Sequence, residues 1–258
     1  MASILDRYGI KEVADVTFYD IKEDGTRGAP VLFLDTLKVS TIEQTAEQAE
    51  ARGGKGNPPL IIWDYGKEIN VTLEDALFSA KSMAIMFGDG TVDTETTFGS
   101  TIVKTWSKKF TEAPTTLEYG GKEITLDKLT NVKYYDEKGA EVTTPAEGTP
   151  AYFLTAEIPV KEVGVIEISS NSFPGTYYVT GDTYARSEIT GKDEFFQFII
   201  QKAKVQSENT ITLEAEGDPS VFNMSLRVLR PADGKMMKLV KYNLNEDGTA
   251  TNGEEAQG

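Results

Sequence analysis

The chain has 258 residues, with 41 acidic and 26 basic side chains, a formal charge of −15, and no cysteine or histidine. The missing residue types exclude disulfides, zinc sites of the usual kind and nucleophiles activated by histidine, which removes most hydrolase mechanisms. The negative charge disfavours binding to nucleic acid or anionic membranes. The length suits one large β domain, or one domain with an insertion, and the hydrophobic content of 39% predicts a folded core.

The N-terminal segments predict strands and no targeting signal. Met1–Ile10 lacks the basic and apolar regions of a signal peptide, and no apolar run approaches the roughly 20 residues of a membrane span. We therefore expect the protein to be made and used in a cytosol. Val13–Ile21 alternates between two faces and is followed by a charged turn and the apolar run Pro30–Leu34, which predicts a β-hairpin.

Residues 41–59 differ from their surroundings, because Ile42–Ala51 is rich in Glu, Gln and Ala. The six residues that follow are Arg52, Gly53, Gly54, Lys55, Gly56 and Asn57. We expect no regular element here, but a long, flexible polar arm between two strands. A phosphate-binding loop is an alternative, yet such a loop is followed by a helix N-terminus, whereas prolines and a strand follow here. Glycines that let backbones approach closely favour an arm that fits against another surface.

A hairpin is predicted directly after this arm. Leu60–Tyr65 is an apolar strand, Gly66 and Lys67 form a tight turn, and Ile69–Leu77 alternates apolar and polar residues. Residues 52–77 are therefore predicted to form, in this order, a glycine-rich arm, a strand, a turn and a second strand.

The next signals predict one helix and then more strands. Ser79 is a suitable N-cap for a helix that runs to about Phe87, and Gly88 ends it. Short strands separated by glycines follow in Gly99–Pro159, as in a meander or small sandwich. Further strands are predicted at Gly164–Ser169, Gly175–Gly181, Phe195–Val205, Thr210–Glu216 and Phe222–Leu229.

The predicted fold is mainly β (all-β to α+β), a β-sandwich or barrel with one short helix and a long arm. Its core falls in two parts, residues 1–98, which contain the arm at 41–59, and residues 161–242. Residues 99–160 form a β insertion or elaboration. Residues 243–258 carry four acids and no base, and we expect a disordered acidic tail there.

Two parts of the sequence carry a family resemblance: the arm and strands between Arg52 and Leu77, and several short motifs in the second half of the chain. These motifs are Pro174–Gly181, Thr190–Asp193, Phe195–Lys202, Leu213–Pro219 and Phe222–Met224. Together these stretches resemble the tail tube (major tail) proteins of long-tailed bacteriophages, whose fold is shared with the tubes of contractile injection systems. The resemblance covers residues 14–87 and 175–242 and leaves residues 99–159 unexplained.

The resemblance implies a structural virion protein without enzymatic activity or cofactor, assembled in the host cytoplasm and located in the tail. Six subunits would form a ring, rings would stack into a hollow tube, and inner strands of each subunit would join a continuous barrel. The arm at Arg52–Asn57 would reach an adjacent subunit or ring. The partners would be further copies and the tape measure, tail terminator and baseplate or distal tail proteins. DNA would pass through without specific binding, and no membrane would be bound.

The negative charge has a use in such a tube, because a lumen lined by carboxylates repels DNA within a Debye length of roughly 8 Å. The candidate lumen residues are Glu74, Asp75, Glu214 and Glu216. Such acid pairs are also compatible with a glycosidase, which would show turnover. A second alternative is a β-sandwich decoration or surface-attachment domain that uses Trp63 and Trp106 to grip sugar or protein, and it would stay a small oligomer.

Overall fold

The computed structural model describes residues 7–92, 101–146, 148–159, 164–211, 221–245 and 248–251. The chain divides into two units: unit 1 comprises Met1–Val92 and Ile166–Gly258, and unit 2 comprises Asp93–Val165. Antiparallel sheets dominate the described residues of both units, which include one short α-helix, so the predicted mainly β fold is confirmed. No helix within the described ranges is long and apolar enough to span a membrane.

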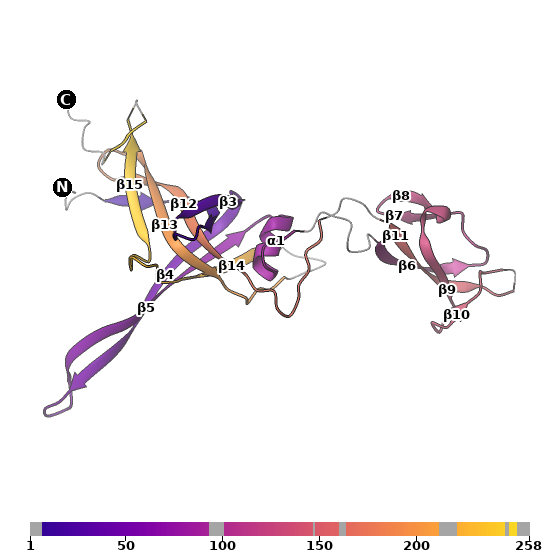
Figure 1. The fold of residues 1–258 in the computed structure, drawn as a ribbon, viewed down its shortest axis with the longest axis horizontal. Coiled ribbons are helices and arrows are strands. Elements are labelled where there is room, and N and C mark those ends of the chain that lie inside the picture. Colours follow the sequence, from indigo (N-terminus) through magenta and orange to yellow (C-terminus); the bar gives the residue numbers. More distant parts are fainter. Residues whose placement is uncertain are drawn as a thin grey trace. The chain divides into compact units, whose positions relative to one another are not determined.

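Unit 1 contains a ten-stranded antiparallel sheet (Figure 1). Its strands are β1 (Tyr8–Ile10), β2 (Asp15–Ile21), β3 (Arg27–Leu34), β4 (Leu37–Arg52), β5 (Pro59–Asp75), β12 (Thr176–Ser187), β13 (Asp193–Val205), β14 (Phe222–Val228), β15 (Lys238–Leu244) and β16 (Ala250–Thr251). The main strand order is β3-β2-β12-β13-β14-β5-β4. β12 also pairs with β1, and β13 also pairs with β15, so the sheet forks at these two long strands.

The core of unit 1 follows from the alternation that the sequence shows. In β12, Gly181, Thr183, Ala185 and Ser187 are buried while the residues between them are exposed. Alternate residues of neighbouring strands meet in one apolar cluster, which also takes in the helix. Its largest fully buried members are Phe18, Leu73, Ile85, Met86, Ile200, Leu226, Val16, Val71, Val179 and Val205.

The helix α1 spans Ala80–Phe87, and its cap is the one that the sequence predicts. The Ser79 side chain accepts a hydrogen bond from the backbone N of Ser82 at 3.0 Å, and the Ser82 hydroxyl accepts one from the backbone N of Ser79 at 2.9 Å. This reciprocal arrangement satisfies two donors at the helix end and fixes where the helix begins.

The arm is a long β-hairpin, and two expectations for it were wrong. β4 continues through Arg52, where we expected irregular chain, and it pairs with β5 along most of its length. β5 is one strand, without a turn at Gly66 and Lys67. These two residues stand opposite Ala46 alone, and Gly66 has a φ of 61°, as in a β-bulge. The bulge takes up the extra residue without ending the strand.

Other strand predictions had mixed outcomes. The β2–β3 hairpin is confirmed, with Gly25 at a φ of 78° in its turn. Gly164–Ser169 forms no strand beyond a single bridge residue at Val165, and most of Thr210–Glu216 lies outside the described residues. At the C-terminus, β16 pairs with β15, with Asn243 opposite Thr251, where the composition had led us to expect disorder. The backbone hydrogen bonds between β15 and β16 order this short stretch in spite of its polar composition.

The described residues of unit 2 form a four-stranded sheet and a two-stranded hairpin. Its elements are β6 (Thr101–Phe110), β7 (Thr116–Tyr119), β8 (Lys122–Thr125), a 3-10 helix (Leu126–Lys128), β9 (Thr130–Tyr135), β10 (Glu141–Val142) and β11 (Ala151–Pro159). The sheet order is β10-β9-β11-β6, and unit 2 has its own apolar core. That core comprises Phe110, Leu117, Leu129, Tyr134, Ala151, Leu154 and Ala156.

Candidate assembly surfaces

The β4–β5 hairpin projects from the rest of unit 1 as a two-stranded ribbon (Figure 1). The first nine residues of β5 are all exposed, whereas from Ile69 onward every second residue is buried in the core. β4 is likewise exposed through its distal half. An isolated two-stranded ribbon is only marginally stable in water, so this one is suited to packing against another surface.

One face of the arm is apolar. Ala51 lies opposite Ile61 and Ala49 lies opposite Trp63, so these side chains share a face of the ribbon, and Tyr65 extends it. Ile61, Trp63 and Tyr65 are exposed by 52%, 53% and 53%. The small alanines leave the larger side chains uncovered. We call Ala49, Ala51, Ile61, Trp63 and Tyr65 the apolar arm face.

The opposite face of the arm is held by polar contacts. Gln48 donates a hydrogen bond to the Asp64 carboxylate at 2.9 Å. The Arg52 Nε donates one to the Glu50 carboxylate at 2.6 Å. Ile62 lies opposite Glu50, on the same face as these polar contacts. The division between the faces is not complete, because Glu47 lies opposite Tyr65 on the apolar side and Ile62 is 51% exposed on the polar side. The arm is therefore amphipathic mainly where Ala49 and Ala51 face Trp63 and Ile61.

The six predicted arm residues, Arg52–Asn57, form the tip of this hairpin. The backbone N of Gly53 donates to the Pro58 carbonyl at 3.2 Å, and the backbone N of Asn57 donates to the Gly54 carbonyl at 3.1 Å. Asn57 has a φ of 50°, in the left-handed region. A strand follows the tip, and no helix N-terminus is present to hold a phosphate.

A second surface consists of two open strand edges in the forked part of the sheet. There the order is β1-β12-β13-β15, and among the described residues β1 has no neighbour beyond β12. β15 pairs with β13 over Lys238–Tyr242, and with β16 at Asn243 and Leu244. Among the described residues no strand pairs with Lys238–Tyr242 on the side away from β13, so this stretch has an open edge, as Tyr8–Ile10 does. Open edges pair readily with other strands.

A charged contact fixes β1, β13 and β15 relative to one another. The Lys241 ammonium donates hydrogen bonds to the Tyr8 hydroxyl and the Glu194 carboxylate, each at 2.6 Å, and lies 4.1 Å from the Tyr8 ring centroid. Burial acts to lower the pKa of Lys241, but the hydrogen bonds to Glu194 and Tyr8 act against it, and the pKa is raised overall. Lys241 stays charged and holds both open edges in place.

Of the four candidate lumen residues, the structure describes Glu74 and Asp75; Glu214 and Glu216 lie outside the described residues. Glu74 is half-buried on the sheet face opposite the core. Asp75 is 7% exposed and faces inward, which disfavours a lumen position for its side chain. The two are neighbours on one strand, and neighbours point to opposite faces.

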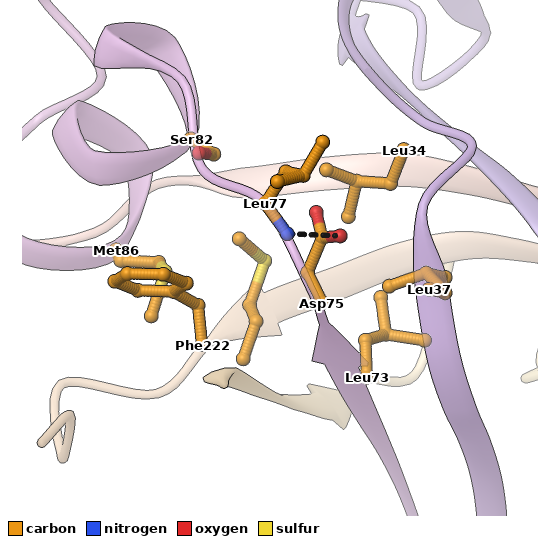
Figure 2. A pocket seen from close by; sticks show the side chains of 9 residues that line it. Leu34, Leu37, Leu73, Asp75, Leu77, Ser82, Met86 and Phe222 are labelled. Carbon is orange, nitrogen blue, oxygen red and sulfur yellow. Dashed lines mark hydrogen bonds between the residues drawn. The ribbon is translucent and has the colours of Figure 1, made fainter. Parts of the chain in front are cut away.

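Asp75 has a structural role instead. Its carboxylate accepts hydrogen bonds from the Thr36 hydroxyl at 2.5 Å and from the backbone N of Leu77 at 3.2 Å. The carboxylate lies beside a cavity of about 10 Å³. Leu34, Leu73 and Phe222 surround it (Figure 2). The cavity is too small for a ligand, and the carboxylate joins the end of β5 to the turn between β3 and β4.

Replacing Asp75 with alanine is expected to lower the free energy of unfolding by about 1–3 kcal/mol, because two donors lose a buried partner. Glu74→Ala, one position away on the opposite face, should change it by less than about 0.5 kcal/mol. Urea unfolding of both variants measures the difference. Equal stability of the two would contradict the role given to Asp75.

The sequence gave no sign of a further acidic pair, Asp15 and Asp182. These residues lie directly opposite each other on β2 and β12, and both are exposed. Gln197 donates a hydrogen bond to Asp182 at 2.6 Å. Carboxylates directly opposite each other destabilise a sheet. The pair only becomes visible once the register is known, because its members are 167 positions apart in the sequence.

The two tryptophans occupy different environments. Trp106 is half-buried, and its indole N donates a hydrogen bond to the Glu118 carbonyl at 2.8 Å within unit 2. Trp63 belongs to the apolar arm face of unit 1. They lie in different units, and the contacts of Trp106 show that it serves packing.

An exposed apolar face and open strand edges are features of structural proteins that assemble with other chains. Residues 8–241 match the model of the YomU/Tube protein family, and the chain belongs to that family. It is similar to the protein named "Tail tube protein" of Bacillus phage SPR, with 25% identity over 264 residues, which cover 96% of this chain and 94% of that protein. The predicted resemblance to phage tail tube proteins is thereby confirmed.

Proposed function

We propose that this protein is the tail tube subunit of a long-tailed bacteriophage, whose copies form hexameric rings that stack into a hollow conduit for DNA. The family and the name of the Bacillus phage relative support the structural role. A tube needs contacts around each ring and between rings, and unit 1 has an unpartnered surface suited to each. The observation that carries the proposal is the amphipathic β4–β5 arm.

Contacts around the ring use the open edges of β1 and β15. If β1 of one copy pairs with β15 of the next, the sheets of neighbouring copies continue into one barrel. Closure of such a barrel leaves no open edge in the ring, which is the physical benefit of a closed sheet. The Lys241 contact with Tyr8 and Glu194 supports this arrangement, because it holds both edges in place before assembly.

Contacts between rings use the apolar arm face. A projecting element that docks on a different surface of the next copy makes a head-to-tail interface, and such interfaces generate open-ended stacks. Full burial of one large apolar side chain contributes about 1.5–3 kcal/mol. Ile61, Trp63 and Tyr65 together are therefore sufficient to stabilise stacking substantially.

The lumen carries carboxylates that repel DNA. Of the acids proposed from the sequence to line the lumen, Glu74 is described and has a partly exposed side chain. Asp15 and Asp182 are stronger candidates, because both are exposed and lie opposite each other. Two carboxylates directly opposite each other lower the stability of the sheet. A role in repelling DNA from the lumen wall explains why the protein has such a pair despite this cost. DNA then slides through without being bound.

Replacing Asp15 and Asp182 together with asparagine is expected to raise the stability of the isolated chain by about 0.2–1 kcal/mol, because the repulsion is removed. Replacing both with lysine should slow DNA release from virions, and the delay should shrink at high salt. Thermal unfolding measures the first effect and time-resolved DNA release the second. Unchanged release from the lysine variant would contradict a lumen position for the pair.

The remaining partners follow from the place of a tube in the tail. The partners expected beside further copies are the tape measure, tail terminator and baseplate or distal tail proteins. Assembly takes place in the host cytoplasm, and the product is located in the virion. Neither a cofactor nor catalysis is part of this role, and the family supports a non-enzymatic protein.

Sedimentation velocity of the purified full-length chain over a range of concentrations tests the proposal. A tube subunit should convert from small species to very large ones above a threshold concentration. A single small oligomer at every concentration would instead favour an attachment domain.

A further inference from the structure

Unit 2 has an open edge that is basic in an acidic chain. β6 pairs with β11 on one side, and within the described ranges no strand lies on its other side. Lys104, Lys108 and Lys109 are exposed on it, and no described carboxylate forms a salt bridge with them. The ammonium groups of Lys104 and Lys108 lie 5.8 Å from the ring centroids of Tyr119 and Phe110.

The arm has an open edge of the opposite charge. β4 is the last strand of the unit 1 sheet and pairs with β5 alone among the described strands. Glu43 and Glu47 are exposed on it, and neither forms a salt bridge with a described basic residue. Among the described residues, each of the two edges thus has no strand beside it and has charged side chains that form no salt bridge.

The spacing of the charges is the same on both edges. Glu43 and Glu47 are four residues apart, as are Lys104 and Lys108, and four residues of strand span about 13 Å. The register of β6 with β11 shifts after Ser107, where Lys108 and Lys109 stand opposite Tyr152 alone, so Lys108 lies at the end of the regular stretch. In an antiparallel pair with Glu47 opposite Lys104, Glu43 falls opposite Lys108. Pairing of either edge with itself can instead place like charges opposite each other, which is unfavourable.

We propose that β4 of one copy adds to the open edge of β6 in a second copy, antiparallel, with Glu47 opposite Lys104 and Glu43 opposite Lys108. Backbone hydrogen bonds provide the affinity, and the two ion pairs select the register. The inference rests on the proposed function, because it needs copies brought together in a tube. It gives unit 2 a role as the receptor for a neighbouring arm, while the apolar arm face contacts a different surface.

The absence of cysteine from the chain allows a direct test by cross-linking. In the proposed register Gln44 lies opposite Ser107, so we would mix full-length Gln44→Cys and Ser107→Cys variants and oxidise them during assembly. A disulfide-linked pair on a non-reducing gel, at least about fivefold above the mixture of Gln44→Cys with Glu123→Cys, supports the inference. Glu123 is exposed on β8 and serves as the matched control. Equal yields would overturn it.

Charge reversal distinguishes strand pairing from the simpler role of edge lysines, which is to prevent aggregation. Adding Lys104→Glu and Lys108→Glu to the Ser107→Cys copy should reduce the cross-link about tenfold. Adding Glu43→Lys and Glu47→Lys to the Gln44→Cys copy should restore it. Reversal without effect, or without rescue, would count against the ion pairs and overturn the proposed register.

The outcome for the tube itself is read separately by electron microscopy of the same samples. Tubes that form normally without the cross-link overturn this inference and leave the proposed function intact. Cross-linked copies that never form tubes support the strand pairing and count against the tube.

Discussion

Replacing Ile61 and Trp63 together with lysine is expected to leave a folded chain that forms no tubes at concentrations where the unaltered chain does. Both side chains are more than half exposed in the single chain, so its stability should change by less than about 0.5 kcal/mol per site. In the tube both would be buried, and the variant would place two ammonium groups in an apolar contact. A loss of about 3 kcal/mol per contact raises the threshold concentration roughly a hundredfold.

The matched control is Ile62→Lys. Ile62 is 51% exposed and Ile61 is 52% exposed, but Ile62 lies on the opposite face of the arm, among the polar contacts of Glu50. Circular dichroism melting measures folding, and pelleting of assembled material measures the threshold. The account requires the double variant to be folded and defective while the control assembles. Equal assembly of all three chains would show that the apolar arm face is not an interface.

Gly181→Ala is expected to be the most destabilising single substitution in unit 1. A Cβ at position 181 would lie 2.1 Å from two ring carbons of Phe198, far inside the roughly 3.5–4 Å of a normal carbon contact. Gly181 is buried in β12 and pairs with Phe198 on β13 and with Val16 on β2, so the backbone has little room to move. Overpacking of this kind costs about 3 kcal/mol or more.

Two comparisons make this prediction specific. Gly9→Ala is the control, because a Cβ there meets no atom within 4 Å, and it should be close to neutral in the isolated chain. Phe198→Leu combined with Gly181→Ala should be more stable than the two separate losses imply, since the smaller side chain makes room for the methyl group. Urea denaturation gives all the free energies. A small loss for Gly181→Ala would mean that Phe198 has space to move.

The sequence predicted elements with strong local signals. The helix after Ser79 was predicted correctly, because the cap and the glycine after Phe87 act within a few residues. The β2–β3 hairpin was predicted by its alternation and its charged turn. Gly175–Gly181 was predicted as a strand and lies largely within β12. The structure also gives a reason for a glycine at position 181, because the ring of Phe198 occupies the space of a side chain there.

The sequence could not predict features that depend on pairing. β4 has many Glu, Gln and Ala residues, which are poor strand formers, and it is a strand because β5 supplies its hydrogen-bonding partners. Gly66 has the same positive φ in a bulge as in a turn, so its residue type does not distinguish the two. The inward direction of Asp75 and the meeting of Asp15 with Asp182 both follow from register, which the sequence alone does not show.

The measurement that tests the central claim most directly is electron microscopy of the purified full-length chain after incubation at increasing concentration. The account predicts hollow filaments built of stacked rings, with sixfold symmetry in end views and a lumen wide enough for duplex DNA. Solid fibres, or a small closed oligomer that persists at every concentration and after addition of preformed tail tips, would contradict it.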